Sequence, residues 1–301
     1  MPLEVHADRG REVAELLYRA FSTTGIHGQK TMPEDEPPAG VARGSLDHVL
    51  FITLVVSIDY QRDAAVLWDA GRRTFADAAT RYLFDPAAVH AAVPADIRRD
   101  MTKYGLSKKP SKDANIWRTV AVSFLKKWGG DPRNFLKDCG GDATVVIERL
   151  RSDTHPQRER LVPDFPYLRG KKIGPLWVRM LRDNVGIEMS RLNEIPIPVD
   201  VHIARATLAT GVVRGSYAGS VEEAFVFIRQ AWFESVCGLR VEGRDMQALD
   251  VDEPLWHLSR FGCTHRDKIS GECPHIDACP VGKFCIRGRL HVDGSKLNVE
   301  T

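Results

Sequence analysis

The sequence has few of the features that mark membrane-spanning, secreted or highly charged proteins. Its longest apolar stretch, Val49 to Ile58, is too short to cross a bilayer. The N-terminal residues show no basic segment followed by an apolar one, so no signal peptide is expected. We therefore expect a cytoplasmic protein with no membrane partner.

The net charge of the chain neither excludes nor indicates a particular class of binding partner. A formal charge of +2 and a pI near 8.2 are too mild to indicate a nucleic-acid partner on their own. Such a partner has to be inferred from local pairs of lysines, at 108–109, 126–127 and 171–172, each of which alone is typical of a solvated surface. With 43% hydrophobic residues, the 301-residue chain can bury a core in one large domain or two ordinary ones.

Strand-like alternation of apolar and polar residues is almost absent, whereas helical spacing recurs along the chain. The segment 46–58 follows a plausible N-cap, Ser45, and is apolar on nearly every side, which predicts a central buried helix. Further helices are expected at about 13–21, 61–82, 86–92, 95–104, 112–128, 132–138, 142–151, 173–184, 201–210, 221–237 and 253–260. The fold class is therefore predicted to be all-α.

The cysteines indicate a metal centre. Without a secretory context, six cysteines favour metal binding or chemistry over disulfides. Four of them, spaced C-x9-C-x5-C-x5-C, fall within 23 residues and can hold a metal with no other ligand: Cys263, Cys273, Cys279 and Cys285. The C-x2-C pair found in most zinc sites is missing, which counts against zinc, and iron–sulfur, zinc and unliganded thiols all stay open as interpretations. Cys139 and Cys237 are expected to be buried structural thiols.

A glycine-bounded turn and a carboxylate lie close together in sequence. The segment Gly170–Gly174 contains Lys171 and Lys172 and opens a predicted helix. Glycines let backbone N–H groups approach an anion, and a helix N-terminus favours negative charge. A proline-rich loop then leads to Asp200 at the start of another helix. These features predict a phosphate-binding turn beside an acid, or a tight helix–helix turn with solvated lysines.

The motifs resemble those of the helix-hairpin-helix DNA glycosylases related to endonuclease III, the iron–sulfur type. In that family a hairpin L-P-G-V/I-G-x-x-T/A is followed by V-D-x-H. The second motif is intact at 199–202, and Ile173-Gly174-Pro175 matches the end of the hairpin, with Lys172 in place of a glycine. The order of further segments is similar from about residue 45 to 285.

The resemblance implies two helical modules with a DNA-binding cleft between them. One is a six-helix barrel module over 45–195, with the hairpin at 165–184. The other is formed by 1–44 and 196–301 and ends in a four-cysteine metal-cluster loop at 263–285. The resemblance further implies a monomeric, nucleoid-associated protein that binds double-stranded DNA with the target base flipped out.

The same resemblance implies a 4Fe–4S cluster held by the four cysteines. The family spaces its ligands as C-x6-C-x2-C-x5-C, and only the last interval matches here. Zinc is the alternative metal.

The implied activity is hydrolysis of the N-glycosidic bond of a damaged, mismatched or modified base. Asp200 takes the position of the catalytic carboxylate, which stabilises an oxocarbenium-like transition state. The lysine with which some relatives cleave the strand corresponds to Leu176, so a monofunctional enzyme is expected. A bifunctional glycosylase and AP lyase using Lys171 or Lys172 is the alternative. A non-catalytic DNA-binding module with a structural metal is the third interpretation.

Two sets of contact residues complete the expected site. DNA contacts are expected from Gly170, Lys171, Lys172, Ile173, Gly174, Ser57, Asp59 and Gln61. The base pocket is expected to involve Tyr60, Asp63 and Trp177, two of which could stack on a flipped base. Adenine-excising relatives carry an acid in the region that matches Thr53–Val56, which here contains none, and this counts against adenine opposite oxidised guanine as the substrate.

Overall fold

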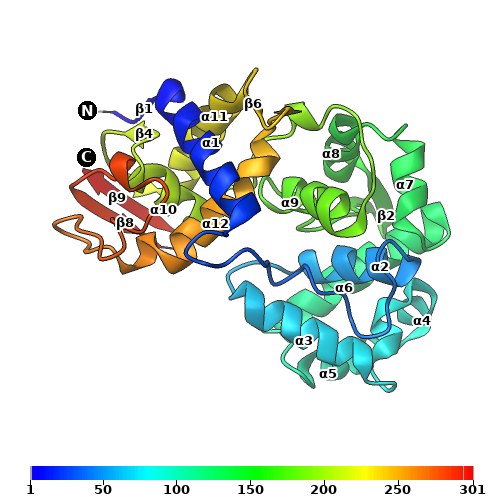
Figure 1. Ribbon diagram of the computed structural model, residues 1–301. Helices are drawn as coiled ribbons and strands as arrows, with labels where there is room; N and C mark the ends of the chain where they lie inside the picture. The colour runs from blue at the N-terminus through cyan, green and yellow to red at the C-terminus, as the bar shows by residue number, and fades with distance from the viewer. Residues whose placement is uncertain (1, 294, 301) are drawn as a thin grey trace. The chain divides into compact units, whose positions relative to one another are not determined.

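The computed structural model describes residues 2–293 and 295–300. The chain divides into two compact units: unit 1, formed by Met1–Thr31 and Asn193–Thr301, and unit 2, formed by Met32–Leu192. Among the described residues, twelve α-helices make up most of the regular structure, with short strands between some of them (Figure 1). The protein is therefore mostly α-helical. No helix in these ranges is long and apolar enough to cross a membrane.

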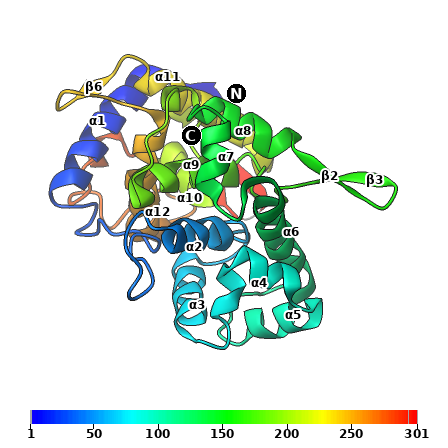
Figure 2. The same cartoon turned by 90° about the vertical axis from the view of Figure 1, so that its right-hand side faces the viewer.

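Unit 2 contains eight helices and one β-hairpin. The helices are α2 (Leu46–Val56), α3 (Ala64–Ala76), α4 (Pro86–Ala91), α5 (Pro94–Thr102), α6 (Pro110–Trp128), α7 (Pro132–Asp138), α8 (Ala143–Ser152) and α9 (Ile173–Met180). Strand β2 (Thr154–Gln157) pairs antiparallel with β3 (Arg160–Pro163), and the hairpin projects from the unit (Figure 2). Short turns of 3-10 helix at Arg81–Phe84 and Leu192–Glu194, and of π-helix at Leu181–Val185, supplement these elements.

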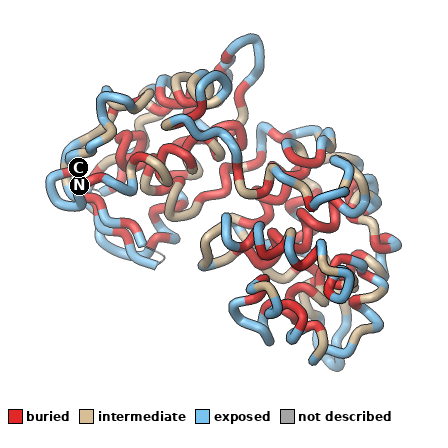
Figure 3. The backbone as a smooth tube through the Cα atoms, turned by 60° about the horizontal axis from the view of Figure 1, so that its bottom comes forward, coloured by how far each residue is buried: buried red, intermediate tan, exposed pale blue. Residues whose placement is uncertain are grey.

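Helix α2 is the centre of unit 2. Every residue from His48 to Val56 is buried, and α3, α6, α7 and α9 all pack against the helix. The Ser45 hydroxyl caps its first turn by accepting the His48 N–H at 3.3 Å. A helix that is apolar on every side has to be covered on every side. The burial of α2 therefore dictates how the other helices of this unit are arranged, and buried segments run through its interior (Figure 3).

Unit 1 combines four helices with short antiparallel sheets. The helices are α1 (Ala7–Thr23), α10 (Val201–Ala209), α11 (Val221–Val236) and α12 (Asp252–Phe261), with 3-10 turns at Ala248–Val251, Cys263–His265 and Gly282–Phe284. Strand β1 (Glu4–Val5) pairs with β4 (Val213–Arg214), and β6 (Arg240–Val241) pairs with β7 (Arg244–Asp245). A three-stranded sheet has the order β5 (Ser216–Ser220), β9 (Lys296–Glu300), β8 (Arg289–Val292). Helix α1 packs on α11, and α10 packs on α12.

The strands correct the prediction of an all-α chain. Residues of β8 and β9 alternate between exposed and buried, and the sheet buries Leu290, Val292, Leu297 and Val299. The Asp293 carboxylate accepts the N–H groups of Ser295 and Lys296 at 2.8 and 2.7 Å, which favours the turn between the two strands. Strands of four and five residues give an alternation too short to distinguish from a loop in the sequence.

The segment 32–44 belongs to unit 2 rather than to the module in which the sequence placed it. The buried Glu34 carboxylate accepts a hydrogen bond from the fully buried Arg179 of α9. Asp35 accepts from the Asn184 amide at 2.7 Å, and the Arg43 guanidinium donates to the Asn184 carbonyl at 2.5 Å. These polar contacts hold the loop on α9 and the residues that follow it, although it is distant from them in sequence.

We expect Arg179→Met to destabilise the protein by about 3–5 kcal/mol, because it leaves the buried Glu34 carboxylate unpaired. The double variant Arg179→Met/Glu34→Leu is expected to recover most of that loss, since no unpaired charge remains. Urea unfolding followed by circular dichroism measures both. Equal stability of the two variants would show that the ion pair does not govern this packing.

Candidate functional site

The predicted hairpin is a compact turn that leads into α9. Arg169 N–H donates to the Phe165 carbonyl at 3.0 Å, and Gly170 N–H donates to the Tyr167 carbonyl at 2.8 Å. Gly174 is required at the helix start, because a Cβ there would lie 3.0 Å from the Leu168 carbonyl oxygen. Its N–H donates to the Gly170 carbonyl at 3.0 Å, so this expected phosphate donor is already used within the turn.

The element before this turn differs from the expected helix. The hairpin β2–β3 separates α8 from the turn, and residues 164–172 form turns and bends without a regular helix. After the turn, α9 ends at Met180 and continues as a π-helical turn to Val185. The region 165–184 therefore contains one helix and a turn, and the nearest preceding helix is α8.

Two of the expected DNA-contact residues form an ion pair. Lys172 Nζ lies 3.4 Å from Asp59 Oδ2, and the Asp59 side chain is only 8% exposed. Lys171, in contrast, is exposed. The structure thus brings together Asp59, which follows α2, and Lys172, which precedes α9, while Lys171 remains the more accessible cation of the turn.

Tyr60 takes part in an aromatic pair that the sequence did not indicate. Its ring stacks on Tyr167 with 4.4 Å between ring centroids, and Lys112 Nζ lies within 4.9 Å of both centroids. The Tyr60 hydroxyl donates to the buried Asp113 carboxylate, and burial together with that bond raises the pKa of Tyr60. One face of the Tyr60 ring is therefore covered by Tyr167, and Lys109 adds a second nearby cation at 5.3 Å.

Three further residues of unit 2 that were expected at the site form hydrogen bonds within the fold. The Ser57 hydroxyl is buried and donates to the Leu54 carbonyl at 2.6 Å, at the end of α2. Gln61 adopts a left-handed backbone conformation with φ of 51° and accepts from Lys109 Nζ at 3.0 Å. The Asp63 carboxylate caps α3 by accepting the Val66 N–H at 3.2 Å.

Trp177 is packed in the core, which corrects its interpretation as a pocket residue. Its side chain has no exposed surface, and its indole N–H donates to the Thr53 hydroxyl at 3.0 Å. The aromatic ring lies on the face of α9 that packs against α2, and it helps to cover that buried helix.

In unit 1, Asp200 is fixed at the start of α10. Its backbone is extended, and Oδ1 accepts the N–H groups of His202 at 2.8 Å and Ile203 at 3.0 Å. Both donors belong to the first turn of α10, so Asp200 is the N-cap of that helix. The two hydrogen bonds hold the carboxylate in one orientation. Because the residue is only partly buried, part of its surface remains accessible. Asp200 is thus the most clearly preorganised acid among the predicted site residues.

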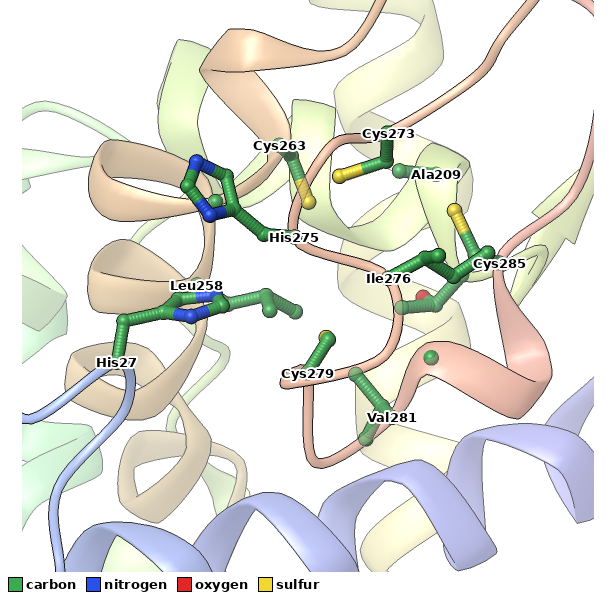
Figure 4. Close-up of a pocket in the computed structure, with 13 residues that line it drawn as sticks. His27, Ala209, Leu258, Cys263, Cys273, His275, Ile276, Cys279, Val281 and Cys285 are labelled. Atoms are coloured by element: carbon green, nitrogen blue, oxygen red, sulfur yellow. The ribbon is translucent and has the colours of Figure 1, made fainter.

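The four clustered cysteines line a single small pocket (Figure 4). Cys263 follows α12, Cys273 and Cys279 lie on the loop that comes next, and Cys285 follows the last 3-10 turn. Ala209, Leu258, Ile276 and Val281 supply apolar walls. The fold therefore gathers the predicted thiols around one mainly apolar space.

The environment of these thiols opposes free thiolates. Burial raises the pKa of Cys263 and Cys285, and raises that of Cys279 to about 11. The buried Arg266 guanidinium partly offsets this by donating to Cys285 Sγ at 3.0 Å. Thiolates in such a pocket need a cation, and a bound metal supplies one.

Thiols are the donors that zinc and iron–sulfur groups take, and all four of these thiols line one pocket. Within residues 2–293 and 295–300, no three or more His, Cys, Asp or Glu side chains are gathered closely enough to hold one metal ion. The two thiols outside the pocket differ from each other: Cys139 is buried, as expected, whereas Cys237 is exposed.

The N-terminal segment contributes a pocket residue that the sequence did not indicate. His27 lines the pocket, and its Nε2 atom is buried and has no hydrogen-bond partner among the described atoms. A Cβ at position 262 would lie 2.5 Å from that nitrogen, so the ring approaches closely only because Gly262 is there. A lone histidine far from the cysteines in sequence gives no recognisable metal-site pattern.

We expect the protein purified without oxygen to be brown and to contain iron and acid-labile sulfide, whereas a zinc protein would be colourless. Cys273→Ala and Cys279→Ala should each remove the metal, because each deletes one thiol of the pocket. Cys237→Ala is the matched control and should retain it. Metal analysis and visible absorption measure the outcome, and equal metal content in all variants would exclude these thiols as ligands.

Comparison with known proteins does not identify a family. No protein-family model matches the chain, and no curated protein sequence matches it either. The functional conclusion therefore depends on the residues and geometry described above.

Proposed function

We propose that the protein is a DNA base-excision glycosylase of the helix-hairpin-helix, iron–sulfur type, and that it is monofunctional. The observation that supports this most directly is the position of Asp200. It is a partly exposed carboxylate, oriented by two backbone N–H groups at the start of α10. Its place in the V-D-x-H motif matches the catalytic acid of that family.

The chemistry needs a fixed negative charge at the sugar. Breaking an N-glycosidic bond develops positive charge at C1′, and a preorganised carboxylate stabilises that charge without reorganising during the reaction. Asp200 would also orient the attacking water. The N–H groups of His202 and Ile203 hold Oδ1, so the carboxylate keeps its position while the base is released.

Unit 2 would supply contacts to the phosphate backbone of double-stranded DNA. Lys171 is exposed at the turn before α9, and Lys172 lies beside it with 30% of its side chain exposed. Exposed lysines at a helix N-terminus are suited to phosphate oxygens. Phosphate contacts position the protein on the duplex, while recognition of the base depends on the pocket around the flipped nucleotide.

The pocket cysteines Cys263, Cys273, Cys279 and Cys285 would hold a 4Fe–4S cluster, with zinc as the alternative. When bound, the group would cross-link the C-terminal loop by metal–thiolate bonds. Exposed residues around it, including Lys268 and Arg287, would form a basic surface. None of these residues takes part in releasing the base.

Two other functions remain open to test. In a bifunctional lyase, a lysine would attack the sugar as a neutral amine. Leu176, which occupies the position of the family lysine, is buried, and the ion pair of Lys172 with Asp59 favours its ammonium form. Lys171 is therefore the better candidate nucleophile of the two. A non-catalytic DNA-binding module would need Lys171 only as a phosphate contact and would not need the charge of Asp200.

The Asp200→Asn variant removes the negative charge of the proposed catalytic residue and keeps the shape of its side chain. Asparagine caps helices about as well as aspartate, so folding and DNA binding should be unchanged. Base release should fall by at least about 10²-fold, the scale seen when one preorganised electrostatic contact is lost. The assay uses duplexes that contain deaminated, oxidised, alkylated or mismatched bases, read after hot alkali. Loss of DNA affinity or of thermal stability would instead assign Asp200 a structural role.

Strand cleavage separates the first two functions. We expect strand breaks only after alkali, and no covalent DNA adduct on borohydride reduction, because Leu176 stands where the family has its lysine. Lys171→Gln and Lys172→Gln are the variants to compare. An adduct that Lys171→Gln abolishes would establish the lyase, while no base release from any duplex would favour the binding module.

A further inference from the structure

A groove in unit 2 lies apart from the turn before α9. It is bordered by His90 at the end of α4, by one face of α6, and by strand β2 with His155. The space not filled by protein atoms amounts to about 1080 Å³. None of the residues predicted for the DNA or base contacts lines it.

The floor of this groove is a polar stripe on α6. The stripe contains Asn115, Arg118, Thr119, Val122, Ser123, Lys126 and Lys127, which follow the spacing of one helix face. From Asn115 to Lys126 it extends roughly 16 Å along the helix axis. The opposite face of α6 buries Trp117 and Phe124 in the core, so the stripe is fixed in place by packing.

A buried carboxylate organises one end of the groove. The side chain of Asp164 is 1% exposed and accepts hydrogen bonds from Lys127 Nζ at 2.5 Å and Ser123 Oγ at 3.2 Å. His155 Nδ1 lies 2.8 Å from the same carboxylate. A histidine held at Nδ1 by a carboxylate directs its Nε2 away from that partner. The side chains that Asp164 holds are thus fixed at the groove wall.

Positive charge exceeds negative charge in the groove. Arg118, Lys126 and Lys127 are opposed by one carboxylate, Asp164, which pairs with Lys127. Arg118 donates to the His90 carbonyl at 3.3 Å, while its buried Nε has no partner among the described atoms. Lys126 is exposed on the same face.

We infer that this groove binds phosphate groups, with Arg118 and Lys126 as the main cationic contacts and His155 as a positioned polar contact. Several convergent cationic and polar side chains in a concave site are suited to a phosphate. Two sources of that phosphate share this chemistry: the backbone of a nucleic-acid strand and a small phosphate compound. The inference requires neither Asp200 nor the cysteines, so it stands or fails independently of base excision.

The test compares three variants, each of which removes one positive charge. Arg118→Gln and Lys126→Gln each remove one groove cation, and Lys137→Gln removes one exposed cation of α7 outside the groove. One arm titrates inorganic phosphate into the full-length protein and follows the backbone amides of α6 by NMR. The other arm measures binding of fluorescent duplex and single-stranded DNA at several salt concentrations.

Both groove variants should weaken binding severalfold in at least one arm, while Lys137→Gln leaves binding unchanged. If the groove binds a DNA backbone, each groove variant should also reduce the slope of log affinity against log salt by about 1. Weaker phosphate binding with unchanged DNA binding would identify a small phosphate compound as the ligand. The inference is overturned if wild-type protein binds neither probe, or if all three variants behave alike in both arms.

Discussion

The complete burial of α2 is the constraint on which unit 2 depends. Because this helix has no polar face, α3, α6, α7 and α9 all have to cover it. That arrangement brings the end of α2 beside the start of α9, and Asp59 consequently meets Lys172. The same packing takes Trp177 into the core. The residues available for binding are therefore those left on the outer faces of the covering helices.

Buried carboxylates form a second level of organisation in unit 2. Asp113 accepts from the Ser107 hydroxyl and from the N–H groups of Lys108 and Lys109, and so fixes the start of α6. Asp164 fixes Lys127 and His155 near the other end of that helix. A buried charge is tolerated only when it is paired and hydrogen-bonded. These networks hold cationic side chains in fixed positions. The hydrophobic core alone would not do so.

In unit 1, the residues predicted for the site lie at a helix start and on a loop. The start of α10 supplies N–H groups that orient Asp200, and the loop after α12 gathers the four thiols around an apolar pocket. Burial raises the pKa of the Cys263 and Cys279 thiols, which disfavours free thiolates in this loop. Such a loop would couple metal binding to local folding, while the carboxylate depends only on its helix.

The sequence by itself determined the helices and the local groups of residues. Periodicity identified α2 and α6, capping identified Ser45, and spacing identified the four cysteines, since all of these depend on residues close together in the chain. Tertiary structure alone decided the contacts between distant residues: Lys172 with Asp59, Tyr60 with Tyr167, and His27 with the cysteine pocket. It also decided the C-terminal sheet, whose strands are too short to show a period and are stable only when paired. Local patterns record what a segment prefers, whereas the partner of a side chain depends on how the whole core is packed.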